Sequence, residues 1–159
     1  MLWRVSMEFK SIPAILRFSI SKEEASVQFY RDMVSKTVNP ATKSLFEVLI
    51  QKEQGHIASL QLEIEKLGHT LDSGNEAIDP PFHWEEQLDT EYPILNMSFA
   101  DALLLAIQKE RAAFRLYAKL LATVRSEPLS QVLLELAEEE MRHVLQLEKE
   151  YETIMHRKG

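Results

Sequence analysis

The chain has 159 residues, which is the usual size of one domain and enough to bury a hydrophobic core. Its net charge of −7, without runs of Lys or Arg, argues against nucleic acid as a partner, and its lack of cysteine excludes disulfides and thiolate-bound metals. With only 4 Gly and 6 Pro, and no apolar run of membrane-spanning length, we expect residues 1–159 to form a single all-α, cytoplasmic domain without membrane contact.

Apolar residues recur at helical spacing in four long segments of the chain. They predict helices over about 12–37, 40–67, 99–125 and 127–156.

Several residues mark where these helices begin. Asn39 and Pro40 form an N-cap with proline at the first helical position, and Ser98 with Asp101 resembles a capping box. The links within each pair of helices are short, so each pair forms an antiparallel hairpin. Residues 69–97 contain Gly and Pro and break the helical pattern, which predicts a long crossover. The sequence therefore predicts a four-helix bundle of two hairpins.

Polar residues interrupt the inward apolar stripe of every helix. In the second helix, Glu53 and His56 fall on the same stripe as Phe46, Leu60 and Leu67. The six such residues on the four stripes are Glu23, Glu53, His56, Glu110, Glu140 and His143.

These positions repeat at one constant offset of 87 residues. Glu23 and Tyr30 of the first helix correspond to Glu110 and Tyr117 of the third. The Glu-x-x-His pair that begins at Glu53 corresponds to the pair that begins at Glu140. The two hairpins are therefore an internal repeat, and its equivalent residues form symmetric pairs facing the bundle axis.

The energetic cost of buried charge suggests what these residues do. Four carboxylates that face one another in a core are poorly solvated and repel, and a domain with about 5 to 15 kcal/mol of net stability tolerates this badly. Two divalent cations would neutralise four carboxylates, and two neutral imidazoles would complete the ligands. Residues three apart share a helix face, so each Glu-x-x-His pair can reach the same ions. The pattern predicts a dinuclear metal site.

A core without metal is also compatible with these residues. The glutamates could pair with Lys or Arg and the histidines could be hydrogen-bonded core residues, although Lys52, Lys109 and Arg142 fall off the inward stripes. Tyr30 and Tyr117 are either core aromatics or donors that orient carboxylates, and we favour the second role. Carboxylate and imidazole ligands without sulfur suit iron or manganese.

The segments EEASVQFY, LIQKEQGHI, KERAAFRLY and LAEEEMRHV resemble, in order, those of the rubrerythrin-like branch of the ferritin-like di-iron superfamily. The resemblance extends from about Ile15 to Tyr151. It implies a ferritin-like bundle in which the six residues bind two iron ions, or manganese or a mixed pair, with Glu53 and Glu140 bridging. Rubrerythrins commonly carry one more Glu where this chain has Ala113, and a rubredoxin domain with cysteine-bound iron.

The resemblance implies a di-iron oxidoreductase that reduces peroxide or dioxygen with electrons from a separate protein such as a rubredoxin, and a homodimer. Two further functions fit the residues. One is a ferroxidase or iron-handling protein with ferrous iron as substrate, and the second is a non-catalytic interaction protein that the metal stabilises.

Overall fold

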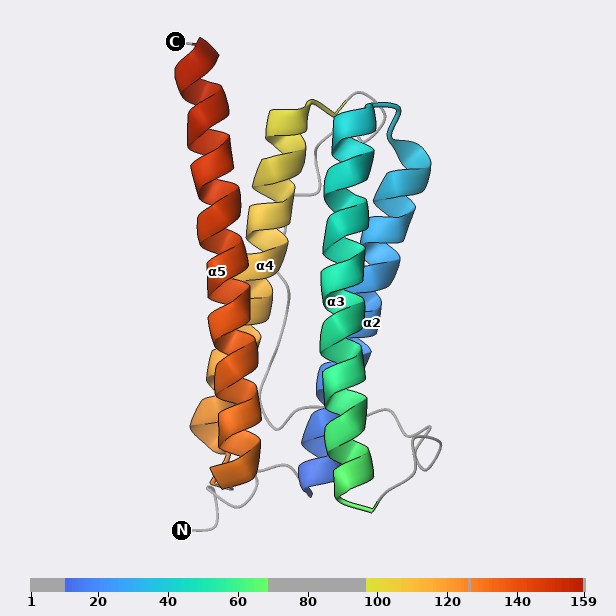
Figure 1. The fold of residues 1–159 in the computed structure, drawn as a ribbon, viewed down its shortest axis with the longest axis vertical. Helices are drawn as coiled ribbons and strands as arrows, with labels where there is room; N and C mark the ends of the chain where they lie inside the picture. Colours follow the sequence, from blue (N-terminus) through green and yellow to red (C-terminus); the bar gives the residue numbers. More distant parts are fainter. Residues whose placement is uncertain (1–10, 69–96, 126, 159) are drawn as a thin grey trace.

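The computed structural model describes residues 11–68, 97–125 and 127–158, which contain four α-helices and no strand. The helices are α2 (Ile12–Lys36), α3 (Pro40–Lys66), α4 (Phe99–Thr123) and α5 (Glu127–Lys158). α2 packs along α3 as one antiparallel hairpin, α4 packs along α5 as the other, and the hairpins lie side by side (Figure 1). The predicted four-helix bundle is confirmed. Of the predicted crossover 69–97, all but Met97 lies outside the described residues.

Side chains at the helix starts satisfy backbone N–H groups that no helical bond can reach. Ser11 accepts from the N–H of Ala14 at 3.2 Å, Asn39 accepts from Ala41 and Thr42, and Ser98 accepts from Asp101 at 3.0 Å. The residue after the α3 cap is Gly68, whose φ of +78° is a conformation that glycine adopts without strain. These local signals fix where the hairpins begin and turn.

The hydrophobic core consists of two clusters, one toward each end of the bundle. The first includes Leu16, Leu60, Leu116 and Leu133, and the second includes Phe46, Leu103 and Leu147. Both clusters draw residues from all four helices, so burial of apolar area holds the two hairpins together at both ends. The polar residues predicted from the sequence fall between these clusters.

Two side chains are placed differently from the sequence pattern. Leu67 is 45% exposed, because it caps α3 beyond the last helical turn, and Ile64 takes the inward position instead. Lys109 lies off the axis-facing stripe as expected, yet it is only 5% exposed, with its Nζ 4.6 Å from the centre of the Phe29 ring. α4 therefore buries a second face toward α2, which a single stripe does not predict.

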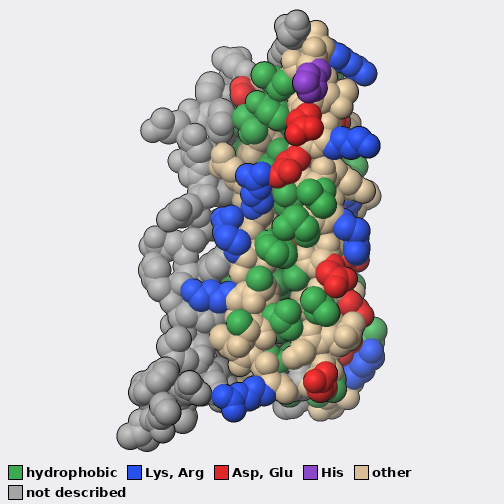
Figure 2. Space-filling view, turned by 90° about the vertical axis from the view of Figure 1, so that its left-hand side faces the viewer, with side chains coloured by type: hydrophobic (Ala, Val, Ile, Leu, Met, Phe, Trp, Pro, Cys, Tyr) green, Lys and Arg blue, Asp and Glu red, His purple; other side chains and the backbone are tan. Residues whose placement is uncertain are grey.

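The outer side of α4 and α5 carries hydrophobic side chains between charged ones (Figure 2). Leu134, Leu145 and Met155 of α5 are exposed, and Arg111 of α4 forms an ion pair with Glu148 of α5. Scattered exposed apolar residues are ordinary on protein surfaces. Within the described residues, no helix combines the length and the apolar character needed to span a membrane.

Candidate metal centre

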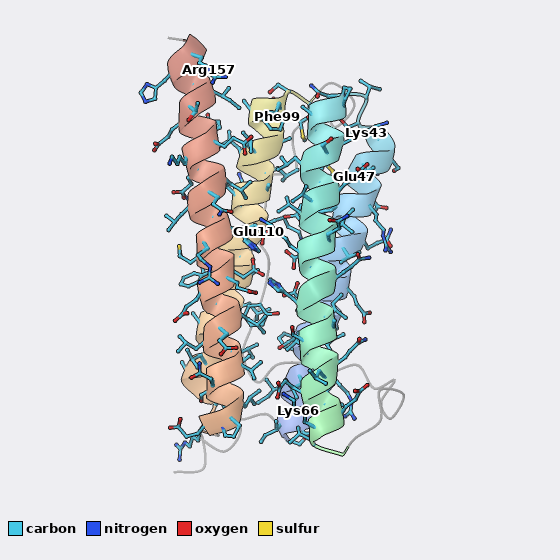
Figure 3. All side chains as sticks on the ribbon, in the orientation of Figure 1. Lys43, Glu47, Lys66, Phe99, Glu110 and Arg157 are labelled. Carbon is cyan, nitrogen blue, oxygen red and sulfur yellow. The ribbon has the colours of Figure 1, made fainter. Side chains whose placement is uncertain are left out.

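The six predicted residues meet in the layer between the two apolar clusters. Glu23 comes from α2, Glu110 from α4, and each Glu-x-x-His pair from α3 or α5. Figure 3 labels Glu110 about midway along the bundle. All of them are buried except His143, whose side chain is 13% exposed. The sequence pattern therefore located a real polar layer within an otherwise apolar interior.

The ligand atoms form two groups that share one residue. Glu23, Glu53, His56 and Glu140 offer atoms within 4.8 Å of one another, and all four are buried. Glu110, Glu140 and His143 offer a second such group. Glu140 belongs to both, which is the placement that a bridging carboxylate needs. Glu53, which the resemblance also assigns as bridging, belongs only to the first group.

His56 has a carboxylate on each side of its ring. Its Nδ1 lies 3.1 Å from Glu140, 3.4 Å from Glu23 and 3.6 Å from Glu53. Its Nε2 lies 2.8 Å from Glu139, whose side chain is 45% exposed. The ring is thus oriented so that Nδ1 faces the cluster while a carboxylate holds the opposite nitrogen, an arrangement found around histidines that bind metals.

Glu139 is a residue that the sequence reasoning missed. It directly precedes Glu140 and lies off the inward stripe, so the spacing within its own helix gives no sign that its carboxylate reaches His56. The internal repeat offers a partial signal, because the position equivalent to Glu139 is Lys52. We therefore expect an anionic neighbour for His56 and a cationic neighbour for His143.

His143 has such different surroundings. Its Nδ1 lies 3.8 Å from Glu140, and its ring stacks parallel to that of His56 with centroids 5.9 Å apart. Burial and the positive charges of Lys52, His56 and Arg142 lower the pKa of His143 to about 4. It is therefore neutral near pH 7 and can offer a nitrogen lone pair.

The carboxylates perturb one another strongly. Burial, together with the charges of Glu23 and Glu140, raises the pKa of Glu53 well above its usual 4.5. Burial and the charges of Glu53 and Glu140 raise the pKa of Glu110 in the same way. Burial also opposes ionisation of Glu23, but contacts with Glu53, His56 and Tyr117 outweigh it and leave its pKa lowered.

For His56, burial favours the neutral ring, but the carboxylates of Glu140, Glu23 and Glu53 outweigh burial and raise its pKa. Without another cation, the cluster holds its charge balance by keeping protons on glutamates and on His56. A divalent cation would replace those protons.

The two predicted tyrosines have different contacts. Tyr117 is fully buried and donates a hydrogen bond to Oε1 of Glu23, and burial with the nearby Glu23 charge raises the Tyr117 pKa well above 10. Tyr30 is also buried, and its ring stacks on Phe46 at a centroid distance of 5.6 Å. Tyr117 thus has the carboxylate-orienting contact, whereas the ring contacts of Tyr30 are those of a core aromatic.

Buried polar atoms without a hydrogen-bond partner indicate whether a metal pair fits this site. Within the described part of the chain, the cluster has seven buried side-chain atoms that have no hydrogen-bond partner. They are Oε2 of Glu23, Oε2 of Glu53, Nδ1 of His56, Oε1 of Glu110, both oxygens of Glu140 and Nδ1 of His143. Orphaned buried groups are costly, and they are rare in such numbers at one place. Carboxylate oxygens and imidazole nitrogens are the donors that iron and manganese accept, so the donor set fits a pair of such ions.

Comparisons with solved structures support the four-helix-bundle fold. No family model and no curated protein matches the chain. Among solved structures, the chain is similar to a hypothetical protein from Pyrococcus furiosus, with 25% identity over 92% of both chains and a TM-score of 0.64. It is also similar to a ferritin-like, diiron-carboxylate protein from Bacillus anthracis str. Ames, with 19% identity, coverage of 89% of this chain and 99% of that one, and a TM-score of 0.56. The fold is therefore the ferritin-like four-helix bundle, and it carries a buried Glu and His cluster able to bind metal.

Proposed function

We propose that the protein is a dinuclear metal oxidoreductase that reduces peroxide or dioxygen with electrons from an external donor. The observation that carries the proposal is the set of buried oxygen and nitrogen atoms, from all four helices, that have no hydrogen-bond partner within the part of the chain that the structure describes. The rubrerythrin-like segments of the sequence and the ferritin-like fold support iron as the metal.

Each residue of the candidate metal centre would have a distinct role. Glu23, Glu53, His56 and Glu140 would hold one ion, and Glu110, Glu140 and His143 would hold the other, so Glu140 belongs to both ligand groups. Two bound ferrous ions can supply two electrons to a small oxidant, each ion giving one electron. Glu139 orients His56, and Tyr117 keeps its proton on Oη and directs it to Glu23. The apolar clusters close the layer toward both ends of the bundle.

The first test is elemental analysis of protein expressed with added iron, followed by anaerobic reduction, peroxide addition and optical spectra. We expect about two iron ions per chain and rapid oxidation to a ferric species. The matched variants are Glu140→Ala, which removes the shared ligand, and Glu138→Gln, which changes an exposed neighbour. Loss of iron in the first and its retention in the second is the expected result. A wild-type chain that binds almost no iron or manganese after reconstitution would refute the metal assignment.

Turnover separates this proposal from the two alternatives. Repeated peroxide consumption with a reductant present supports the oxidoreductase. Oxidation of many ferrous ions per chain, with particles large enough to store the product, would instead identify a ferroxidase. Metal binding that raises the unfolding temperature, without any reaction with an oxidant, would identify a metal-stabilised interaction protein.

The partners belong to the proposal as well. The electron donor would be a protein such as a rubredoxin, because these 159 residues contain no cysteine with which to hold a second iron centre themselves. We also propose a homodimer, which size-exclusion chromatography with light scattering tests directly. Stopped-flow reduction of the ferric protein by a rubredoxin tests the donor. A rate no faster than that of a small chemical reductant at equal concentration would contradict it.

A further inference from the structure

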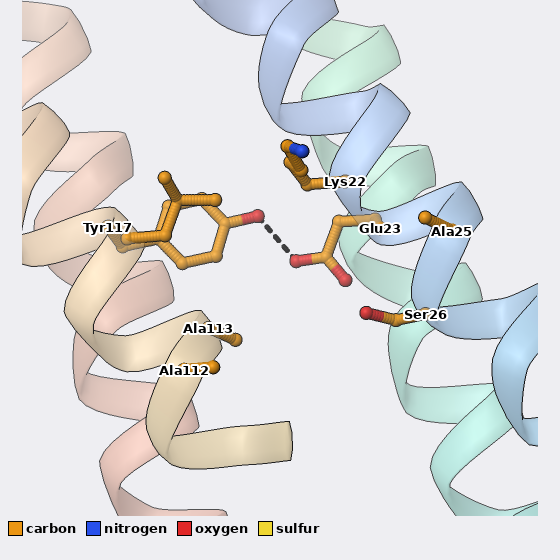
Figure 4. A pocket seen from close by; sticks show the side chains of 8 residues that line it. Lys22, Glu23, Ala25, Ser26, Ala112, Ala113 and Tyr117 are labelled. Atoms are coloured by element: carbon orange, nitrogen blue, oxygen red, sulfur yellow. Dashed lines mark hydrogen bonds between the residues drawn. The ribbon is translucent and has the colours of Figure 1, made fainter. Parts of the chain in front are cut away.

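A cavity of about 100 Å³ lies between α2 and α4, beside the candidate metal centre (Figure 4). Four small side chains line much of it, namely Ala25, Ser26, Ala112 and Ala113. Ala25 is exposed and Ser26 and Ala113 are half-buried, so this side of the cavity lies near the surface. Its inner end is formed by the buried residues Glu23 and Tyr117. The cavity therefore extends from near the surface to a residue of the metal cluster.

The internal repeat explains why the cavity is open on one side. The α2 lining residues Glu23, Ala25 and Ser26 are equivalent, at the offset of 87, to Glu110, Ala112 and Ala113 of α4. Three residues after Ser26 and Ala113, however, the equivalent pair is Phe29 and Leu116. The described lining includes Leu116 but not Phe29.

The side chains around Phe29 also fill more space than those around Leu116. The Phe29 ring lies under the buried Lys109, so an aromatic ring and an alkyl chain fill the space on that side of the repeat axis. On the other side Leu116 is smaller than a phenylalanine, and the side chain of Lys22 is only half-buried. The departure from symmetry at this pair leaves the space that forms the cavity.

The inner end of the cavity is polar, whereas most of its walls are alanine and leucine side chains, with Ser26 and Lys22 as the other polar lining residues. Oε1 of Glu23 accepts the hydrogen bond from Tyr117, and Oε2 is buried without a hydrogen-bond partner among the described residues. In Figure 4, this second oxygen points away from Tyr117, toward the side of the cavity where Ser26 lies. A ligand that matches the cavity has one small polar end, directed to Glu23, and a short apolar end that contacts alanines and Leu116.

The volume limits the size of such a ligand. A water molecule occupies about 30 Å³ of liquid, and a dry protein cavity of about 150 Å³ can hold benzene. A space of about 100 Å³ therefore suits a molecule of roughly four to six non-hydrogen atoms. Hydrogen peroxide and dioxygen fill only part of it, and an aromatic or long-chain hydroperoxide is too large.

We infer that the cavity binds the alkyl group of a short organic hydroperoxide, such as ethyl hydroperoxide, with the peroxide end beside Glu23. The inference rests on the proposed peroxide reduction and specifies its substrate. In the reaction ROOH + 2 electrons + 2 protons → ROH + H₂O, the O–O bond breaks and the alkyl group leaves as the alcohol. Two bound ferrous ions would supply the electrons, the external donor would replace them, and the protons would come from solvent.

Rates with peroxides of different size test the inference. Iron-loaded, reduced protein is mixed anaerobically with hydrogen peroxide, ethyl hydroperoxide or cumene hydroperoxide, and the oxidation rate is followed optically. We expect the wild-type protein to react with ethyl hydroperoxide at least as fast as with hydrogen peroxide, and much more slowly with cumene hydroperoxide.

Two variants fill the cavity, Ala113→Leu and Leu116→Phe, and Ala58→Leu adds the same bulk at an exposed site on α3. Each filling variant should slow the ethyl hydroperoxide reaction about tenfold or more, because fitting or excluding one or two methylene groups has effects of this size. The hydrogen peroxide rate and the iron content should change little, and Ala58→Leu should change neither rate. Equal loss of both rates at unchanged iron content, or no loss in either variant, would overturn the inference.

A second measurement does not depend on activity. Because the chain has no cysteine, Ala113→Cys places a single thiol in the cavity wall. In the metal-free protein, we expect methyl methanethiosulfonate to modify this thiol faster than benzyl methanethiosulfonate does. Addition of Leu116→Phe should slow the reaction with the methyl reagent. A thiol that is inert to the small reagent would show that the cavity is not reached from solvent and would overturn the inference. If the wild-type protein binds two irons but reacts with no peroxide, the proposed function fails even when labelling succeeds.

Discussion

The Nε2 atom of His56 lies 2.8 Å from a carboxylate oxygen of Glu139, whereas the position equivalent to Glu139 in the internal repeat holds Lys52. The same asymmetry is visible in burial, since the His56 side chain is 6% exposed and that of His143 is 13% exposed. An anionic neighbour makes an imidazole a stronger ligand, and a cationic neighbour makes it a weaker one. The two halves of the candidate metal centre are therefore chemically unequal despite their common ligand pattern.

Removal of the Glu139 carboxylate should weaken metal binding at the His56 half of the site. We expect Glu139→Gln to lower metal affinity by about 10- to 100-fold, because loss of a group that orients a ligating histidine has effects of this size. Calorimetric titration of the metal-free protein with ferrous iron or manganese measures the affinity. Glu138→Gln removes the same charge at the preceding, exposed position and should leave the affinity nearly unchanged. An equal loss of metal affinity in the two variants would mean that Glu139 acts only through its charge and not by orienting His56.

Reversal of charge at Lys52 should have the opposite effect on the other half. The Lys52 charge acts on His143 and contributes to lowering its pKa to about 4. Lys52→Glu gives this half an anionic neighbour, as Glu139 gives the first, and we expect the weaker of two metal-binding steps to become tighter. Lys66→Glu, an exposed change on the same helix far from the site, controls for net charge. If both changes tighten binding equally, long-range charge rather than the local position of Lys52 is responsible.

The fold and most of the site follow from local rules that a sequence displays. Helical periodicity, the caps at Asn39 and Ser98, and the repeat of 87 residues depend on spacing within one helix or on a comparison of two. The position of each ligand in the bundle interior depends on the same spacing, so the six residues were found together. Their assignment as ligands remains a prediction until metal is measured.

What the sequence did not reveal depends on contacts between helices. Glu139 turns toward His56 from another hairpin, and the burial of Lys109 over Phe29 depends on how closely α2 approaches α4. The cavity results from a difference in volume between Phe29 and Leu116, which has meaning only after the helices are packed. Leu67 was misplaced because the stripe was extended to the capping residue, one position past the last helical residue of α3.

The metal-free protein should lose stability as the pH rises above about 6.5. The folded-state pKa values of Glu53, Glu110 and His56 are all raised, so above their unfolded-state values the folded protein binds more protons than the unfolded one. These groups make their full contribution to the free energy of unfolding when the pH is below their unfolded-state pKa values. The contribution decreases as the pH rises toward their folded-state pKa values. The lowered pKa values of Glu23 and His143 act below pH 6.5 and do not oppose this trend.

Thermal unfolding of chelator-treated protein between pH 6.5 and 9 measures this effect. Glu53→Gln removes one of the titrating groups and should flatten the decrease. Metal-loaded protein should differ most from metal-free protein at high pH, because the ligands must lose protons to bind a cation. A metal-free protein that gains stability with pH over this range would contradict this arrangement of buried charges.

Loss of the Tyr117 hydroxyl should destabilise the metal-free protein without removing a ligand. Tyr117→Phe removes the hydroxyl that donates to Oε1 of Glu23, and a buried hydrogen bond to a charged group contributes about 2 kcal/mol. Urea denaturation of the metal-free protein measures the loss, and Tyr151→Phe, which removes a partly buried hydroxyl outside the cluster, is the matched control. We expect Tyr117→Phe still to bind about two ions, because the ligand atoms remain and a metal ion bound to Glu23 compensates for part of the missing hydrogen bond. A variant that is as stable as Tyr151→Phe but has lost metal would mean that Tyr117 acts on the ions directly rather than through Glu23.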